Sequence, residues 1–108
     1  MIQPRLFEVP DETVAIEDVI LYALGDFQSR GKVLANRELA LDRLRGAFVR
    51  TFRKFKIPDL TDERVIEALN NLGARVVTLP SFVAKHPYRV TIPDNVVIMA
   101  VNFYTKSQ

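Results

Sequence analysis

The sequence predicts an α+β domain in which three helices precede a small antiparallel sheet of about three strands. Apolar residues recur at steps of three and four through most of residues 12–72, which is the spacing of amphipathic helices. After Gly73, short runs of β-branched and aromatic residues alternate with prolines, a pattern typical of strands and turns. The chain has 108 residues, 48% hydrophobic and 26% charged, so residues 1–108 fit one globular domain.

The first helix is expected over residues 12–30, after a short edge strand at residues 6–9. Asp11 follows Pro10 and offers an N-terminal cap, and Gly31 suits the position just beyond the C-terminal end. The apolar side of this helix would consist of Ile16, Val19, Ile20, Ala23, Leu24 and Phe27. Its acids are Glu12, Glu17, Asp18 and Asp26, which would make it the negatively charged helix of the domain.

The second helix is expected to organise the fold, because residues 34–57 form a long amphipathic stretch. Asn36 is the expected N-terminal cap, and Pro58 would end the helix near Lys56. Large apolar residues recur along one side of it: Leu41, Leu44, Phe48, Phe52 and Phe55. We expect this stripe to lie in the core, where each buried side chain contributes about 1.5–3 kcal/mol.

The third helix is expected over residues 62–72, with Thr61 as its cap and Gly73 just beyond its end. Strands are expected at residues 75–79, 88–92 and 96–104, the last two joined by a turn at residues 93–95. The final segment is almost continuously apolar and rich in β-branched residues. It therefore predicts the most buried strand of the sheet.

The residue types present do not support an enzyme. Cysteine is absent, which excludes disulfides, thiolate nucleophiles and cysteine-bound metals. His86 is the only histidine, no serine lies in a nucleophile motif, and the four glycines form no phosphate-binding loop. We therefore expect no catalytic residue, no metal site and no cofactor. No signal peptide and no membrane-spanning stretch is apparent, so we expect a cytoplasmic protein that does not contact membranes.

Charge is distributed unevenly along the chain. Residues 1–29 carry one arginine and six acids, whereas residues 30–56 carry nine lysines and arginines and only two acids. Residues 57–108 carry five charges of each sign. The net charge of +2 therefore hides a local positive field, and local fields matter more for partners than net charge does.

The positive charge gathers on one side of the predicted second helix. Arg43, Arg50, Arg53 and Lys54 fall opposite the apolar stripe, with Gly46 among them. Gly46 would let a phosphate backbone approach, or it would let another helix cross closely, and the sequence does not distinguish these two explanations. A solvated face is the plain alternative for the charges, since cations also suit the end of a helix.

A second basic cluster lies beside the predicted hairpin and contains Lys85 and Arg89. These side chains could reach phosphates, although charges also protect the edges of sheets. The candidate nucleic-acid-binding residues are therefore Arg43, Arg50, Arg53, Lys54, Lys85 and Arg89.

The predicted order of three helices and then strands resembles a winged helix, in which the third helix enters the major groove. The likeness is one of topology, and the third helix departs from it by beginning with two acids, Asp62 and Glu63. It would offer bases only Arg64, Asn70 and Asn71. We therefore expect a small non-enzymatic nucleic-acid-binding domain that contacts phosphates through its second helix. The alternative is a protein-interaction module, a homodimer or a subunit of a larger complex, in which the acidic first helix meets the basic second helix of another chain.

Overall fold

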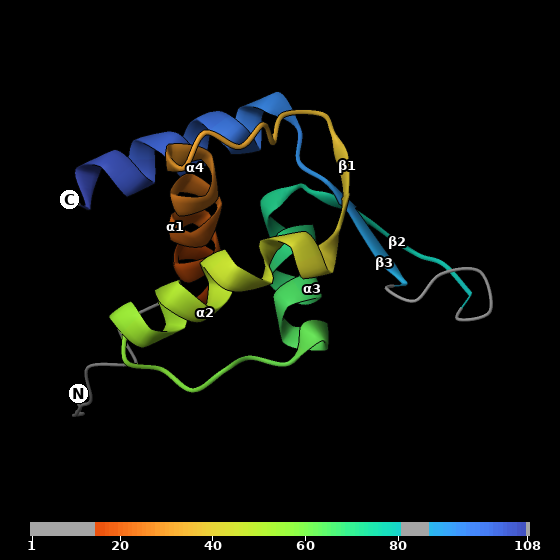
Figure 1. Cartoon of the computed structure of the whole chain (residues 1–108), viewed down its shortest axis with the longest axis horizontal. Helices are drawn as coiled ribbons and strands as arrows, with labels where there is room; N and C mark the ends of the chain where they lie inside the picture. The colour runs from red at the N-terminus through yellow and green to blue at the C-terminus, as the bar shows by residue number, and fades with distance from the viewer. Residues whose placement is uncertain (1–14, 81–86, 108) are drawn as a thin grey trace.

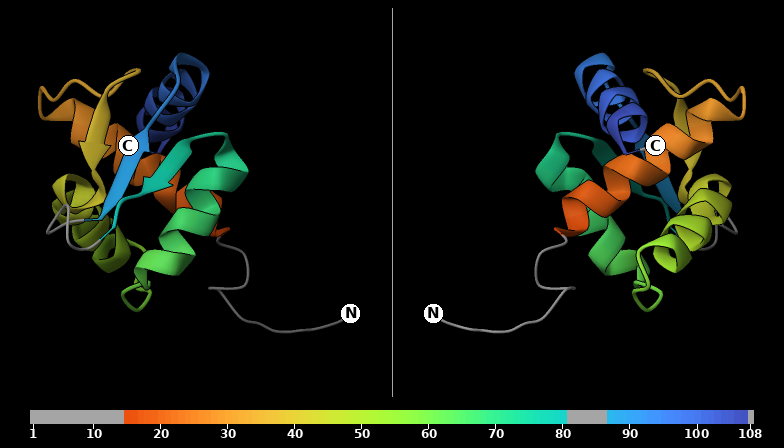
Figure 2. Two further views of the ribbon diagram at one scale, coloured as in Figure 1. Left: turned by 90° about the vertical axis from the view of Figure 1, so that its right-hand side faces the viewer. Right: turned by 90° about the vertical axis from the view of Figure 1, so that its left-hand side faces the viewer.

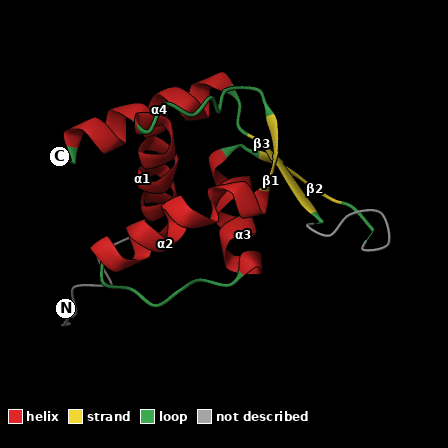
Figure 3. Cartoon of the chain, in the orientation of Figure 1, coloured by secondary structure: helices red, strands yellow, loops and turns green. Residues whose placement is uncertain are grey.

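A computed structural model of the chain describes residues 15–80 and 87–107, and it shows an α+β fold (Figures 1 and 3). The elements in chain order are α1 (Ile16–Ser29), β1 (Glu38–Ala40), the 3-10 helix η2 (Leu41–Leu44), α2 (Arg45–Lys54), α3 (Asp62–Leu72), β2 (Arg75–Thr78), β3 (Tyr88–Thr91) and α4 (Asp94–Lys106). The prediction of an α+β fold with a small antiparallel sheet is confirmed. The predicted order is wrong, because the strand β1 follows the first helix and the last described element is the helix α4.

Helix α1 is the central element of the fold, a place that the sequence assigned to the second helix. Every residue from 19 to 27 is buried, because α2, α3 and α4 all pack against α1 (Figures 1 and 2). A helix that is apolar on nearly all sides is stable only when it is surrounded in this way. Ala15 is extended, so the helix begins at Ile16 and not at residue 12. The predicted strand at residues 6–9 lies outside the described residues.

The predicted start of the second helix is wrong. Residues 38–40 form the strand β1, and Asn36 has a left-handed backbone with φ of 55° where a helix cap was expected. The amide of Asn36 donates to the carbonyl of Ile92 at 2.8 Å, and Leu39 lies opposite Val90 in the sheet. Backbone groups of this stretch therefore form hydrogen bonds with distant parts of the chain. These bonds outweigh the helical spacing of its apolar residues.

The predicted core stripe of the second helix is confirmed. Leu41, Leu44, Phe48 and Phe52 are buried, and Phe55 packs against the core as a half-buried residue. The step of three from Leu41 to Leu44 falls in the 3-10 helix η2, which has three residues per turn. The apolar side therefore continues without a break from η2 into α2.

Helix α3 and the two strands after it lie where the sequence predicts them. The hydroxyl of Thr61 accepts a hydrogen bond from the amide of Arg64 at 3.2 Å, and Gly73 ends the helix with φ of 104°. The sheet has the order β1-β3-β2, and both pairs are antiparallel. The central strand β3 buries Val90 in the core, and the pleat turns Arg89 to the outer face.

The predicted C-terminal strand is wrong, because residues 94–106 form the helix α4. A strand would place Asn102 on the same face as Val96 and Ala100, whereas a helix turns it to the opposite side. Val96 and Ala100 are buried and Asn102 is exposed, as the helix requires. We predicted a strand because β-branched residues favour strands. In this segment the packing of α4 against α1 outweighs that preference.

Candidate nucleic-acid interface

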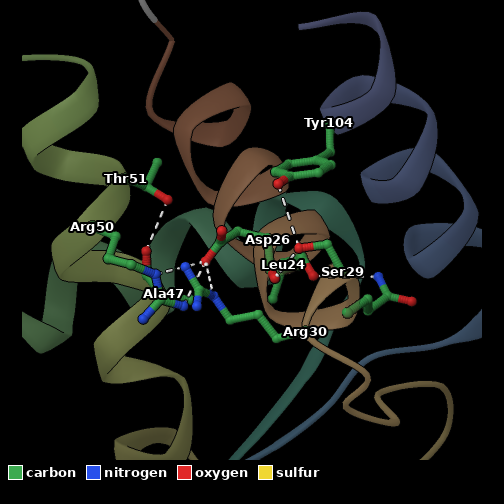
Figure 4. Close-up of polar contacts among 9 residues, drawn as sticks. Leu24, Asp26, Ser29, Arg30, Ala47, Arg50, Thr51 and Tyr104 are labelled. Carbon is green, nitrogen blue, oxygen red and sulfur yellow. Dashed lines mark hydrogen bonds and ion pairs between the residues drawn. The ribbon is translucent and has the colours of Figure 1, made fainter. Parts of the chain in front are cut away.

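A carboxylate on α1 anchors one arginine of the predicted basic face. Nε and Nη2 of Arg50 donate to one oxygen of Asp26 at 3.0 and 2.6 Å, and Nε of Arg30 lies 3.5 Å from the same oxygen (Figure 4). The Asp26 side chain is only 12% exposed, so the carboxylate of this pair is largely shielded from water. The ion pair joins α1 to α2, while the Arg50 side chain remains 42% exposed.

The role of Asp26 was missed at the level of sequence. Asp26 was counted only as one of the acids that make the first helix negative, and no partner was predicted for it. The available signal was the position of Asp26 next to Phe27 and two residues after Leu24, inside an apolar stretch. A carboxylate in such a stretch requires a partner, because burying an unpaired charge is costly.

The side of η2 and α2 that faces away from the core carries three arginines around a glycine. We define the arginine face as Arg43, Gly46, Arg50 and Arg53, all of which are exposed. Arg43 and Arg53 form no ion pair with any residue in 15–80 or 87–107. The only described atom within 4 Å of a Cβ placed on Gly46 would be Nη1 of Arg50, at 3.4 Å. Hence, within the described part of the chain, no second helix crosses at Gly46, and the close-crossing explanation is wrong.

Two other predicted site residues, Lys54 on α2 and Arg89 on β3, are among the described residues. Lys54 lies over the ring of Tyr22 on α1, with Nζ 5.4 Å from the ring centre, which is a cation–π distance. Arg89 is half-buried on the outer face of the sheet, opposite Ala40 and Val77. Lys85 and His86 lie outside the described residues. The structure therefore places Lys54 one turn after Arg50 on α2, with its ammonium over Tyr22, and places Arg89 on β3.

Helix α3 has a different electrostatic character from α2. It carries Asp62, Glu63 and Glu67 against the single Arg64, whose Nε lies 3.8 Å from a Glu67 oxygen. Asn71 donates to Glu17 of α1 at 3.0 Å, and this hydrogen bond is the main reason that the pKa of Glu17 lies below its ordinary value. The exposed side of α3 is therefore mainly acidic, with Arg64 and Asn71 engaged in contacts and Asn70 exposed.

An ion-pair network connects η2, α2 and α3. The Arg45 guanidinium lies 3.1 Å from oxygens of both Asp42 and Asp62. Hydrogen bonds to these two carboxylates raise the pKa of Arg45 above its ordinary value. Arg45 is thus occupied by two acids and belongs to the contacts that position α3.

In residues 15–80 and 87–107, no three His, Cys, Asp or Glu side chains are grouped as metal ligands would be. None of the helices described there has the length and hydropathy required to cross a membrane. Comparison with protein-family models, curated proteins and solved structures found no match to this chain. The candidate function therefore depends on the arginine face itself.

Proposed function

We propose that this chain is a small non-enzymatic domain that binds nucleic acid by contacting phosphates through the arginine face. The observation that carries the proposal is the exposure of Arg43, Arg50 and Arg53 on one side of η2 and α2, around Gly46, where the Arg50 side chain is the described neighbour that a Cβ would meet. Guanidinium groups bind phosphate oxygens in a planar, two-pronged geometry. The pairing of Arg50 with Asp26 holds that guanidinium in place and leaves part of it open to solvent.

The order of the elements supports the same proposal. Helix, strand, two helices and a hairpin, with a sheet in the order β1-β3-β2, resembles a winged helix. In helix-turn-helix domains the first helix of the motif crosses the phosphate backbone and the second enters the major groove. By this likeness α2 is the backbone-contacting helix, which is the place of the arginine face.

The acidic side of α3 bears on specificity. Glu63 and Glu67 would lie near phosphates if α3 entered a groove, and Asn71 is engaged with Glu17. We therefore infer that backbone contacts dominate, so binding depends little on base sequence. Nucleic acids of different sequence should then compete equally well for the chain.

A binding assay with two charge-reversal variants tests this proposal. Arg43→Glu with Arg53→Glu reverses two cations that pair with no acid in residues 15–80 or 87–107. Arg64→Glu with Arg75→Glu makes the same charge change on α3 and β2. We expect the first variant to lose binding to a fluorescent duplex and to heparin, and the second to retain it within a few-fold. Equal losses would show a general effect of charge, and a loss confined to the second variant would place binding on α3 and the sheet. Either outcome contradicts the arginine face.

The structure also bears on the alternative, a protein-interaction module. It assumed that acids of α1 are available to meet arginines of α2 from another chain. Asp26 instead pairs with Arg50 and Arg30 of its own chain. Asp26 is therefore engaged within its own chain, and a contact through the other acids of α1 remains the alternative proposal.

A further inference from the structure

Two arginines from different helices converge on Asp26. Arg30 lies at the C-terminal end of α1 and Arg50 lies within α2, and both place nitrogens beside the same oxygen of the Asp26 carboxylate (Figure 4). Because they approach one atom, the two guanidinium groups are close neighbours. The Arg30 side chain is 53% exposed and the Arg50 side chain is 42% exposed, so both also reach the solvent. Arg30 was not among the predicted site residues.

Arg30 decides the net charge of this group of side chains, which we define as the Asp26 cluster: Asp26, Arg30 and Arg50. The carboxylate balances one guanidinium, so Asp26 and Arg50 alone would form a neutral pair. Neither arginine pairs with another acid in residues 15–80 or 87–107. Arg30 therefore gives the Asp26 cluster one net positive charge, which enables the cluster to attract an anion.

The hydrogen-bond donors of Arg50 are only partly used by Asp26. A guanidinium carries N–H groups on all three of its nitrogens, arranged in a rigid plane. Nε and Nη2 of Arg50 donate to Asp26, whereas Nη1 lies toward Gly46, where it would be 3.4 Å from a Cβ atom. Gly46 belongs to the arginine face. The N–H groups that Asp26 leaves unused therefore lie on the side of α2 where we place the phosphates.

We propose that Arg30 and Arg50 together bind one phosphodiester group of the nucleic acid, with the Asp26 carboxylate between the two cations. Two like charges at this separation would repel one another without the carboxylate. Phosphate oxygens accept short, charge-assisted hydrogen bonds from guanidinium groups, so one phosphate can join both arginines. The inference rests on the nucleic-acid binding proposed for the arginine face. It deepens that function by adding the end of α1 to the contact surface.

The salt dependence of binding to a fluorescent duplex tests Arg30. Arg30→Ala leaves the neutral pair of Asp26 and Arg50, so the slope of log K against log salt should lose about 0.9 in magnitude, the value for one phosphate. Affinity at about 0.1 M salt should fall about eightfold, which is that slope over one decade of salt. Arg75→Ala is the matched control, since Arg75 is an exposed arginine on β2. Its slope and affinity should remain those of the unmodified chain, and circular dichroism would verify that both variants are folded.

A second variant tests whether the two arginines share one phosphate. Asp26→Asn with Arg30→Ala leaves Arg50 with its full charge, so the slope should return to that of the unmodified chain. If each arginine contacted a separate phosphate, the slope would remain reduced by about 0.9. That result would overturn the shared site.

Two further results would overturn the proposal: an unchanged slope in Arg30→Ala, or an equal loss in Arg75→Ala, which would show a general effect of charge. Arg43→Glu with Arg53→Glu, measured in parallel, separates this proposal from the proposed function. If that variant loses binding and Arg30→Ala does not, nucleic-acid binding stands and Arg30 is not a contact. If the unmodified chain shows no salt-dependent binding, both proposals fail.

Discussion

Gly25 of α1 lies so close to Ala100 of α4 that a Cβ atom on the glycine would be 2.8 Å from the alanine's carbonyl oxygen. The same atom would overlap the side chain of Tyr104. Glycine inside a helix is unfavourable by about 1 kcal/mol relative to alanine. Gly25 is therefore explained by the close crossing of α1 and α4, which lets α4 cover the central helix.

The two helical glycines should respond in opposite ways to replacement by alanine. Gly25→Ala should lower the free energy of unfolding by about 1–3 kcal/mol, because the backbone of α4 would have to move. Gly46→Ala should raise it by up to about 1 kcal/mol, since only the flexible end of Arg50 lies near. Urea unfolding of both variants measures the difference. A stabilised Gly25→Ala variant would show that α4 does not lie against α1 in this way.

The pair of Asp26 and Arg50 should contribute to stability more than an exposed ion pair. Asp26→Ala should lower the free energy of unfolding by about 1–2 kcal/mol, because Arg50 would lose two charged hydrogen bonds to a sheltered carboxylate. Asp42→Ala is the control, since the Asp42–Arg45 pair is exposed on both sides and such pairs contribute about 0.3–0.5 kcal/mol. Chemical denaturation at neutral pH gives both values. Equal effects would mean that α1 and α2 are not joined through Asp26.

The aromatic residues of α2 should anchor this helix in the core. Phe48 and Phe52 are buried, with ring centres 6.2 Å apart in a stacked arrangement. Phe48→Ala and Phe52→Ala should each lower the free energy of unfolding by about 3–5 kcal/mol. Equilibrium unfolding would measure this loss. A value below about 1 kcal/mol for both variants would place the stripe outside the core.

The contact between Glu17 and Asn71 should make stability depend on pH. The hydrogen bond from Asn71 lowers the pKa of Glu17 in the folded chain from the ordinary value of 4.5. A carboxylate whose pKa falls on folding stabilises the protein above its unfolded pKa, and that contribution is lost as the pH falls through the folded pKa. Asn71→Ala should therefore be less stable than the unmodified chain at neutral pH and equally stable well below pH 4.5. A stability difference that does not change with pH would contradict this assignment.

Local patterns in the sequence were sufficient for the parts of the fold that depend on neighbouring residues. The stripe from Leu41 to Phe52 and the ends of α3 at Thr61 and Gly73 follow from spacing and capping alone. The strand β1 and the helix α4 were not predictable in this way. Leu39 pairs with Val90, and α4 requires the crossing at Gly25, so both elements depend on contacts between distant residues.

Only part of the candidate site was predictable, again because contacts between distant residues do not follow from local spacing. Helical spacing places Arg43, Arg50 and Arg53 on one side, and the structure retains this arrangement across η2 and α2. Spacing within one helix contains no information about α1, so it could not show that Asp26 holds Arg50 or that Lys54 turns to Tyr22. Those two contacts engage Arg50 and Lys54 with α1, so Arg43 and Arg53 are the arginines of the face that form no ion pair with a described residue.

The salt dependence of binding tests the arginine face most directly. If Arg43, Arg50 and Arg53 each contact a phosphate, log K plotted against log salt should have a slope of about −3 for duplex DNA, at about −0.9 per phosphate. Arg43→Ala with Arg53→Ala should reduce the magnitude of that slope by about 2 while the chain remains folded. The absence of salt-dependent binding to either DNA or RNA, or an unchanged slope in this variant, would contradict the proposed function.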